Sequence, residues 1–122
     1  MSLSKSEEQL MQILWKQEKA FMRDLIAAYS EPKPASTTVA TLLKRMQDKN
    51  FVAYKQFGRS REYYALVKRK DYFSKQMNGM IKDFFNNSTA QFASFFTRES
   101  NMDERELREL RKLIDEKIKN KK

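Results

Sequence analysis

The sequence predicts a mainly α-helical protein that carries one small β-hairpin. Only two Gly and two Pro occur among 122 residues, well below the average usage of roughly 7% and 5%, so few positions interrupt a helix. Apolar residues recur at helical spacing through most of the chain, whereas two short runs around Gly58 are rich in β-branched and aromatic residues. One sheet-like element within a helical chain is therefore expected.

The first helix is predicted from about Lys5 to Gln17. Ser4 and Glu7 form a capping box at its start, and Leu3 can pack over its entry. A second, shorter helix is expected over Phe21–Ser30, because Pro32 and Pro34 then stop any helix. The apolar positions of these two helices include Leu10, Ile13, Leu14, Leu25, Ile26 and Tyr29.

The third helix is predicted to begin after Ser36, which is a good N-cap residue. Its core-facing stripe repeats at helical spacing, so the opposite face points outward. The stripe consists of Val39, Leu42, Leu43 and Met46. The outward face consists of Thr37, Thr41, Lys44 and Asp48, with Thr38, Ala40 and Arg45 on its flanks.

A hairpin follows, with strands over about Phe51–Phe57 and Arg61–Val67 and a turn at Gly58-Arg59-Ser60. Three helices and then a two-stranded hairpin is the order of the winged helix-turn-helix. In that fold the third helix enters the major groove of DNA and the hairpin lies along the backbone. The sequence thus predicts a winged helix over residues 1–70.

The rest of the chain is expected to be helical, with breaks at Asn86-Asn87-Ser88 and Ser100-Asn101. A tail of this length is too small to bury so many large apolar side chains alone, so residues 71–122 are expected to form a homodimer. Folding back onto the first domain and binding to a membrane surface are the alternatives. The expected dimerisation residues are Phe73, Met77, Met80, Phe84, Phe92, Phe95, Leu107, Leu110 and Ile114.

Positive charge is concentrated in one segment. Residues 44–70 hold nine Lys and Arg against two acidic residues, whereas residues 1–43 hold five of each sign. Clustered cations neutralise phosphates, and Thr side chains can contact phosphates or base edges, so double-stranded DNA is the expected partner. The candidate DNA-binding residues are Ser36, Thr37, Thr38, Ala40, Thr41, Lys44, Arg45, Lys55, Arg59 and Arg61.

The composition excludes most catalytic chemistry. The chain has no Cys and no His, so thiolate or imidazole nucleophiles, the usual zinc and copper sites and disulfides are not available. No cofactor, no metal and no enzymatic activity are expected. No apolar run is long enough to span a membrane, and the N-terminus has no secretion signal, so a cytoplasmic protein without membrane insertion is expected.

Several short motifs in order resemble the penicillinase repressor family, the BlaI/MecI/CopY group. They are Leu3-Ser4 to Glu7, Met11–Trp15, Thr37–Met46, Lys49–Val52, Gly58-Arg59, Tyr63–Leu66 and, more weakly, Glu106–Arg111. The resemblance implies a winged-helix dimer that represses transcription from a dyad operator and dimerises through its C-terminal helices. It also places base reading on Thr37, Thr38, Ala40 and Thr41 and the wing on residues 58–61.

Three features of the sequence depart from the family pattern. Ala40 stands where members often carry a longer polar or basic side chain. Members induced by β-lactams are cut by a membrane sensor protease at an Asn-Phe bond, and the matching bond here is Phe95-Phe96. The Cys-x-Cys tail of copper-responsive members is absent. The operator preference and the inducing signal are therefore not predicted.

The main hypothesis is a cofactor-free homodimeric repressor. The rival hypothesis is a protein-binding adaptor that uses the winged helix and the Phe-rich tail as docking surfaces.

Overall fold

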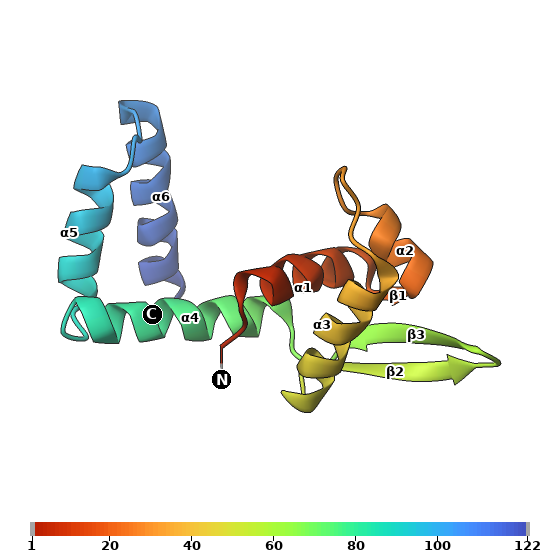
Figure 1. The fold of residues 1–122 in the computed structure, drawn as a ribbon. Helices are drawn as coiled ribbons and strands as arrows, with labels where there is room; N and C mark the ends of the chain where they lie inside the picture. The colour runs from red at the N-terminus through yellow and green to blue at the C-terminus, as the bar shows by residue number, and fades with distance from the viewer. Residues whose placement is uncertain (1, 122) are drawn as a thin grey trace. The chain divides into compact units, whose positions relative to one another are not determined.

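The computed structural model describes residues 2–121 and divides into two compact units, Met1–Gln76 and Met77–Lys122. The first unit contains α1 (Lys5–Gln17), β1 (Lys19–Phe21), α2 (Met22–Ala27), α3 (Ser36–Asp48), β2 (Val52–Phe57), β3 (Ser60–Ala65) and the start of α4 (Arg69–Phe84), as Figure 1 shows. The second unit contains the rest of α4, α5 (Thr89–Glu99) and α6 (Glu104–Asn120). The expected fold, a winged helix followed by C-terminal helices, is confirmed.

Helix α1 begins as its sequence predicts. The Ser4 hydroxyl accepts a hydrogen bond from the Glu7 amide at 3.2 Å, and the Ser4 amide donates to Glu7 Oε1 at 2.7 Å. These two bonds satisfy backbone donors that the first helical turn leaves without partners.

The sheet has three antiparallel strands in the order β1-β3-β2, and its first strand was not predicted. In β1, Ala20 lies opposite Tyr63 and Phe21 lies opposite Glu62. Phe21 therefore ends a strand and precedes α2, where the sequence prediction placed it inside a helix. The Phe21 amide donates to Asp24 Oδ2 at 3.0 Å, which holds the first turn of α2.

Helix α2 is also shorter than predicted, because it ends at Ala27 rather than at Ser30. The Lys33 ammonium donates to the carbonyl oxygens of Ala27 at 2.9 Å and Tyr29 at 2.7 Å. A lysine from the proline-containing loop thus satisfies carbonyls that the end of the helix leaves free.

Helix α3 begins one residue earlier than its sequence suggested. Ala35, held extended at φ −68° and ψ 149°, is the N-cap residue, and no side chain caps this end. The amides of Thr38 and Val39 donate to the Ala35 carbonyl at 3.1 and 3.2 Å. The prediction that Ser36 caps the helix is therefore wrong, and Ser36 is its first residue.

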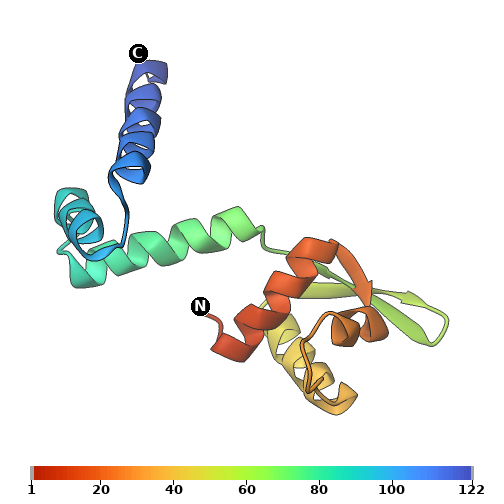
Figure 2. The ribbon, with the colours of Figure 1, turned by 90° about the horizontal axis from the view of Figure 1, so that it is seen from above.

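The wing, as we call residues 52–65, is the hairpin of β2 and β3 (Figures 1 and 2). Phe57 pairs with Ser60, so only Gly58 and Arg59 form the turn, and Ser60 belongs to a strand instead of the predicted turn. Gly58 has a φ of +60°, which fits a two-residue hairpin turn with glycine at its first position.

The core of the first unit joins the three helices to the sheet. Trp15 donates from Nε1 to the Val67 carbonyl at 2.8 Å, and its ring lies 5.8 Å from that of Tyr72. Tyr72 in turn donates to Glu8 Oε2 at 2.6 Å, so the start of α4 is bound to α1. The buried apolar side chains of this core are Leu3, Leu10, Met11, Leu14, Ala20, Leu25, Val39, Leu42, Leu43, Met46, Phe51, Val52, Tyr63 and Tyr72.

The second unit shows both predicted helix breaks. Asn86 and Asn87 adopt positive φ after α4, and Ser88 caps α5 through the Gln91 amide at 3.1 Å. Asp103 caps α6 through a capping box with Glu106. Asn tolerates the left-handed backbone region better than most residues, which explains why the chain turns there.

Candidate nucleic-acid interface

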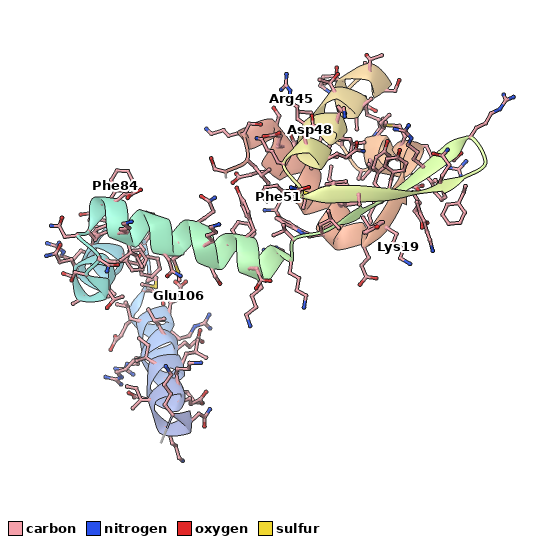
Figure 3. The ribbon with its side chains drawn as sticks, turned by 90° about the horizontal axis from the view of Figure 1, so that it is seen from below. Lys19, Arg45, Asp48, Phe51, Phe84 and Glu106 are labelled. Atoms are coloured by element: carbon pink, nitrogen blue, oxygen red, sulfur yellow. The ribbon has the colours of Figure 1, made fainter. Side chains whose placement is uncertain are left out.

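The outward face of α3 is a polar ridge. We use "the α3 ridge" for the seven residues Ser36, Thr37, Thr38, Ala40, Thr41, Lys44 and Arg45, all of which are exposed. The apolar residues of the same helix, Val39, Leu42, Leu43 and Met46, are buried on its other side. Figure 3 shows Arg45 directed away from the sheet and from α1. The ridge is therefore free to meet a partner.

Thr41 differs from its neighbours on the ridge. Its hydroxyl donates to the carbonyl of Thr37 at 2.9 Å, one helical turn earlier. Such a bond occupies the hydroxyl proton and leaves an acceptor oxygen and a methyl group for a partner. Thr41 is thus better placed for an apolar contact than for donating a hydrogen bond.

The wing carries three exposed cations, Lys55, Arg59 and Arg61. Arg59 lies in the turn itself. The Arg61 guanidinium lies 4.3 Å from the centre of the Tyr54 ring, and Lys55 pairs across the hairpin with Glu62. Stacking on an aromatic face orients a guanidinium while leaving its edge available to an anion.

Two lysines of the basic segment already have acidic partners. Lys44 is 3.2 Å from Asp48, and because both side chains are mostly exposed this pair is weak. Lys49 lies 2.7 Å from Glu7 Oε1, and its side chain is only 27% exposed. Lys44 can leave Asp48 and bind a phosphate. Lys49 is instead held by its ion pair with the buried Glu7 carboxylate.

The Glu7 carboxylate is nearly fully buried, at 2% exposure. Burial alone raises the pKa of a carboxyl group. Here the hydrogen bonds from Lys49 and from Ser4 outweigh burial and lower the pKa of Glu7 below its ordinary value. The ion pair therefore ties the start of α1 to the end of α3 in its charged form.

Apolar side chains remain exposed in the second unit. No residue of α5 or α6 is buried in the single chain. Phe84 is 79% exposed, and Figure 3 shows it projecting from the end of α4. Of the other predicted dimerisation residues, Met77, Met80, Phe95, Leu107 and Ile114 are exposed and Phe92 and Leu110 are half-buried.

Phe73 is the one predicted dimerisation residue that lies in the first unit. Its ring is 5.9 Å from that of Trp15, and the Arg69 guanidinium lies 5.1 Å above it. Phe73 remains 38% exposed, so it belongs partly to the core of its own unit.

Sequence reasoning missed two features of this region. The Glu7–Lys49 pair joins residues 42 positions apart, and the acidic partner is already visible as half of a capping box. Arg23 lies beside the wing tip, together with Arg59 and Arg61, but it belongs to a segment of balanced charge. Neither feature produces a local pattern.

Within residues 2–121, no group of His, Cys, Asp or Glu side chains is arranged to hold a metal ion. In the same range, no helix combines the length and the apolar character that crossing a membrane requires.

The comparisons with known proteins agree with this geometry. The penicillinase repressor family matches residues 3–116. Two relatives, the methicillin resistance regulatory protein MecI of Staphylococcus aureus (strain N315) and that of Staphylococcus aureus, are each 25% identical over 116 residues, which is 94% of this chain and 94% of theirs. Because the match covers nearly the whole chain, the protein belongs to the penicillinase repressor family and is a DNA-binding transcriptional repressor rather than an enzyme.

Proposed function

We propose that this repressor acts in the cytoplasm as a homodimer on a dyad operator. The α3 ridge reads bases in the major groove, the wing binds the phosphate backbone, and the second unit holds two copies together. Repression is then steric, because a dimer seated on a promoter needs no chemical reaction.

The observation that carries this proposal is the joint exposure of the α3 ridge and the wing cations on one folded unit. Phosphate contacts supply affinity and fix the register of a protein on the duplex, whereas contacts to base edges supply sequence preference. The cations suited to phosphate contacts are Arg45, Lys55, Arg59 and Arg61. Base contacts fit other ridge residues, because hydroxyl groups can bond to base edges and methyl groups can pack on thymine methyl groups. These residues are Thr37, Thr38, Ala40 and Thr41.

The apolar surface of the second unit supports the dimer. A single chain buries no residue of α5 or α6, and isolated helices of this length are marginal in water. A second copy would cover Ile114 and the other exposed apolar side chains of α6, which otherwise face solvent. A two-fold dimer also presents two α3 ridges to two half-sites of a palindrome.

Footprinting on duplexes selected from a random library tests the operator. We expect two protected half-sites related by a dyad, with centres about 10 base pairs or a multiple apart. Protection without sequence preference, or loss of all binding at salt where a partner protein is still captured, would favour the adaptor hypothesis instead.

Ile114→Asp tests the dimer. In a single chain this exposed position tolerates a charge, so a change from dimer to monomer in sedimentation at micromolar concentrations would come from the partner copy. Lys112→Asp, an exposed position on the opposite side of α6, is the matched control. A wild-type chain that sediments as a monomer would refute the proposal.

Cleavage by a membrane sensor protease has a structural condition. The Phe95–Phe96 bond lies inside α5, and a helical backbone must open locally before a protease can cut it. We propose that such cleavage, if it relieves repression, begins with opening of α5. Limited proteolysis with and without operator DNA measures that opening.

A further inference from the structure

A hollow of about 490 Å³ lies in the first unit, between the start of α2 and the tip of the wing. We call it the arginine hollow. It is lined by Phe21, Met22, Arg23, Phe57, Arg59, Ser60, Arg61 and Tyr63. The proposed DNA contacts use two of these residues, Arg59 and Arg61, and give the other six no part in binding.

The register of the sheet explains why the hollow exists. Strand β1 pairs with β3 only over residues 62–64, and Phe21 is its last paired residue. The chain then turns into α2, so the edge of β3 at Ser60 and Arg61 is left uncovered by β1. The space beside that edge is the hollow.

Three arginines, Arg23, Arg59 and Arg61, line this space, and no acidic residue does. Within residues 2–121, none of the three forms an ion pair. Arg23 lies 5.8 Å from the centre of the Phe21 ring, and the neighbouring Asp24 carboxylate is already engaged by the Phe21 amide. The arginines are therefore available to an anion, whose planar oxyanion groups guanidinium forks bind in pairs of hydrogen bonds.

Aromatic rings form the other part of the lining. Phe21 and Phe57 meet edge to face with centroids 6.1 Å apart, and half of the Phe57 surface is exposed. Edge-to-face and offset arrangements can be extended by a further ring. A phosphate of the DNA backbone would use the arginines but would leave these aromatic surfaces in water.

We propose that the arginine hollow binds a small planar organic anion, with its ring against Phe21 and Phe57 and its acidic group on Arg23, Arg59 and Arg61. The volume falls in the range of small-molecule sites, which combine apolar walls with a few placed polar groups. This chemistry fits an aromatic carboxylate or an aromatic phosphate.

Binding of such an anion has a consequence for DNA. It occupies the two wing arginines that the proposed function assigns to phosphates, so the ligand and the duplex compete for Arg59 and Arg61. This second part rests on the proposed function, whereas binding of the anion itself does not.

Calorimetric titration of the full chain with three probes tests the first part. Phenyl phosphate carries the ring and the charge, inorganic phosphate carries only the charge, and phenol carries only the ring. We expect phenyl phosphate to bind about tenfold more tightly than inorganic phosphate, and phenol to show no saturable binding. Equal binding of the two phosphates, or no saturable binding of phenyl phosphate, would overturn the proposal.

Variants locate the site. Arg23→Ala leaves the wing intact and is expected to weaken phenyl phosphate binding about tenfold or more, while Lys75→Ala removes an exposed charge elsewhere and should change nothing. Phe57→Ala is expected to remove the preference for phenyl phosphate over inorganic phosphate. Retained phenyl phosphate affinity in Arg23→Ala would place the binding elsewhere and refute the assignment.

The second part needs operator DNA. We expect phenyl phosphate to displace the duplex from the wild-type chain, and Arg23→Ala to resist that displacement. Phenyl phosphate that binds by calorimetry without displacing DNA would refute competition alone. A chain that binds phenyl phosphate but never binds a duplex would instead refute the proposed function.

Discussion

Replacing Arg59 and Arg61 together by alanine removes both guanidinium groups from the wing tip while leaving the hairpin pairs intact. Arg59 lies in the turn and Arg61 is the exposed cross-strand partner of Gln56, so neither side chain holds the core. The substitution should therefore act on DNA binding and hardly on folding. Circular dichroism melting checks that the fold is unchanged.

The expected magnitude follows from counterion release. Each lost phosphate contact lowers the slope of log K against log salt by about 0.9, so two contacts amount to about 1.8 per wing and about 3.6 for a dimer. Between 50 and 200 mM salt, wild-type binding should then weaken roughly twelvefold more per wing than binding by the variant. Fluorescence anisotropy with one operator duplex and one unrelated duplex measures both slopes.

The control is Lys119→Ala with Lys121→Ala, which removes the same formal charge from exposed positions at the end of the second unit. It should leave the slope near that of the wild type. The reasoning is refuted if the wing variant keeps the wild-type slope on both duplexes, or if the control lowers the slope equally. In either case the wing makes no direct phosphate contact.

Three further predictions concern single side chains. Thr41→Val keeps the methyl group and loses a hydroxyl whose proton is already donated within α3. It should therefore weaken operator binding less than Thr41→Ala does. If the two variants weaken binding equally in fluorescence anisotropy, the hydroxyl itself reads DNA. Glu7→Gln removes the charged hydrogen bond with Lys49 and should lower the unfolding free energy by about 2 kcal/mol. Because the pKa of Glu7 is lowered in the folded state, this difference should be present at about pH 7 and should be lost as the pH falls through that lowered pKa, which a series of urea titrations at decreasing pH measures. Burial and the hydrogen bond to the Glu8 carboxylate raise the pKa of Tyr72 to about 12. Ultraviolet titration should therefore show a late phenol ionisation that Tyr72→Phe lacks. The unfolding free energy should fall as the pH rises from the ordinary tyrosine pKa of 10 to about 12.

Local patterns predicted those elements of the fold whose cause is local. The start of α1 follows from Ser4 and Glu7, three residues apart, and the turn of the wing follows from the conformational freedom of Gly58. The outward position of Thr37 and Lys44 follows from the buried stripe on the same helix. In each case the residues that decide the structure lie within a few positions of one another.

The features that sequence reasoning missed depend on distant partners. Strand β1 has three residues and exists because Ala20 pairs with Tyr63 far along the chain. Lys49 adds to the positive charge of residues 44–70, yet its partner Glu7 lies near the start of the sequence. A charge pattern shows where cations are concentrated and not which of them are already paired.

Neither α5 nor α6 has a buried residue in a lone chain. Whether these two helices stay folded therefore depends on how much of the protein is present. In a dimer assembled as proposed, dilution below the dissociation constant would remove the cover from these helices and the second α3 ridge from the operator at the same moment. Repression would then switch off more steeply than the fall in protein level, and the unassembled subunits would become the ones most accessible to cellular proteases.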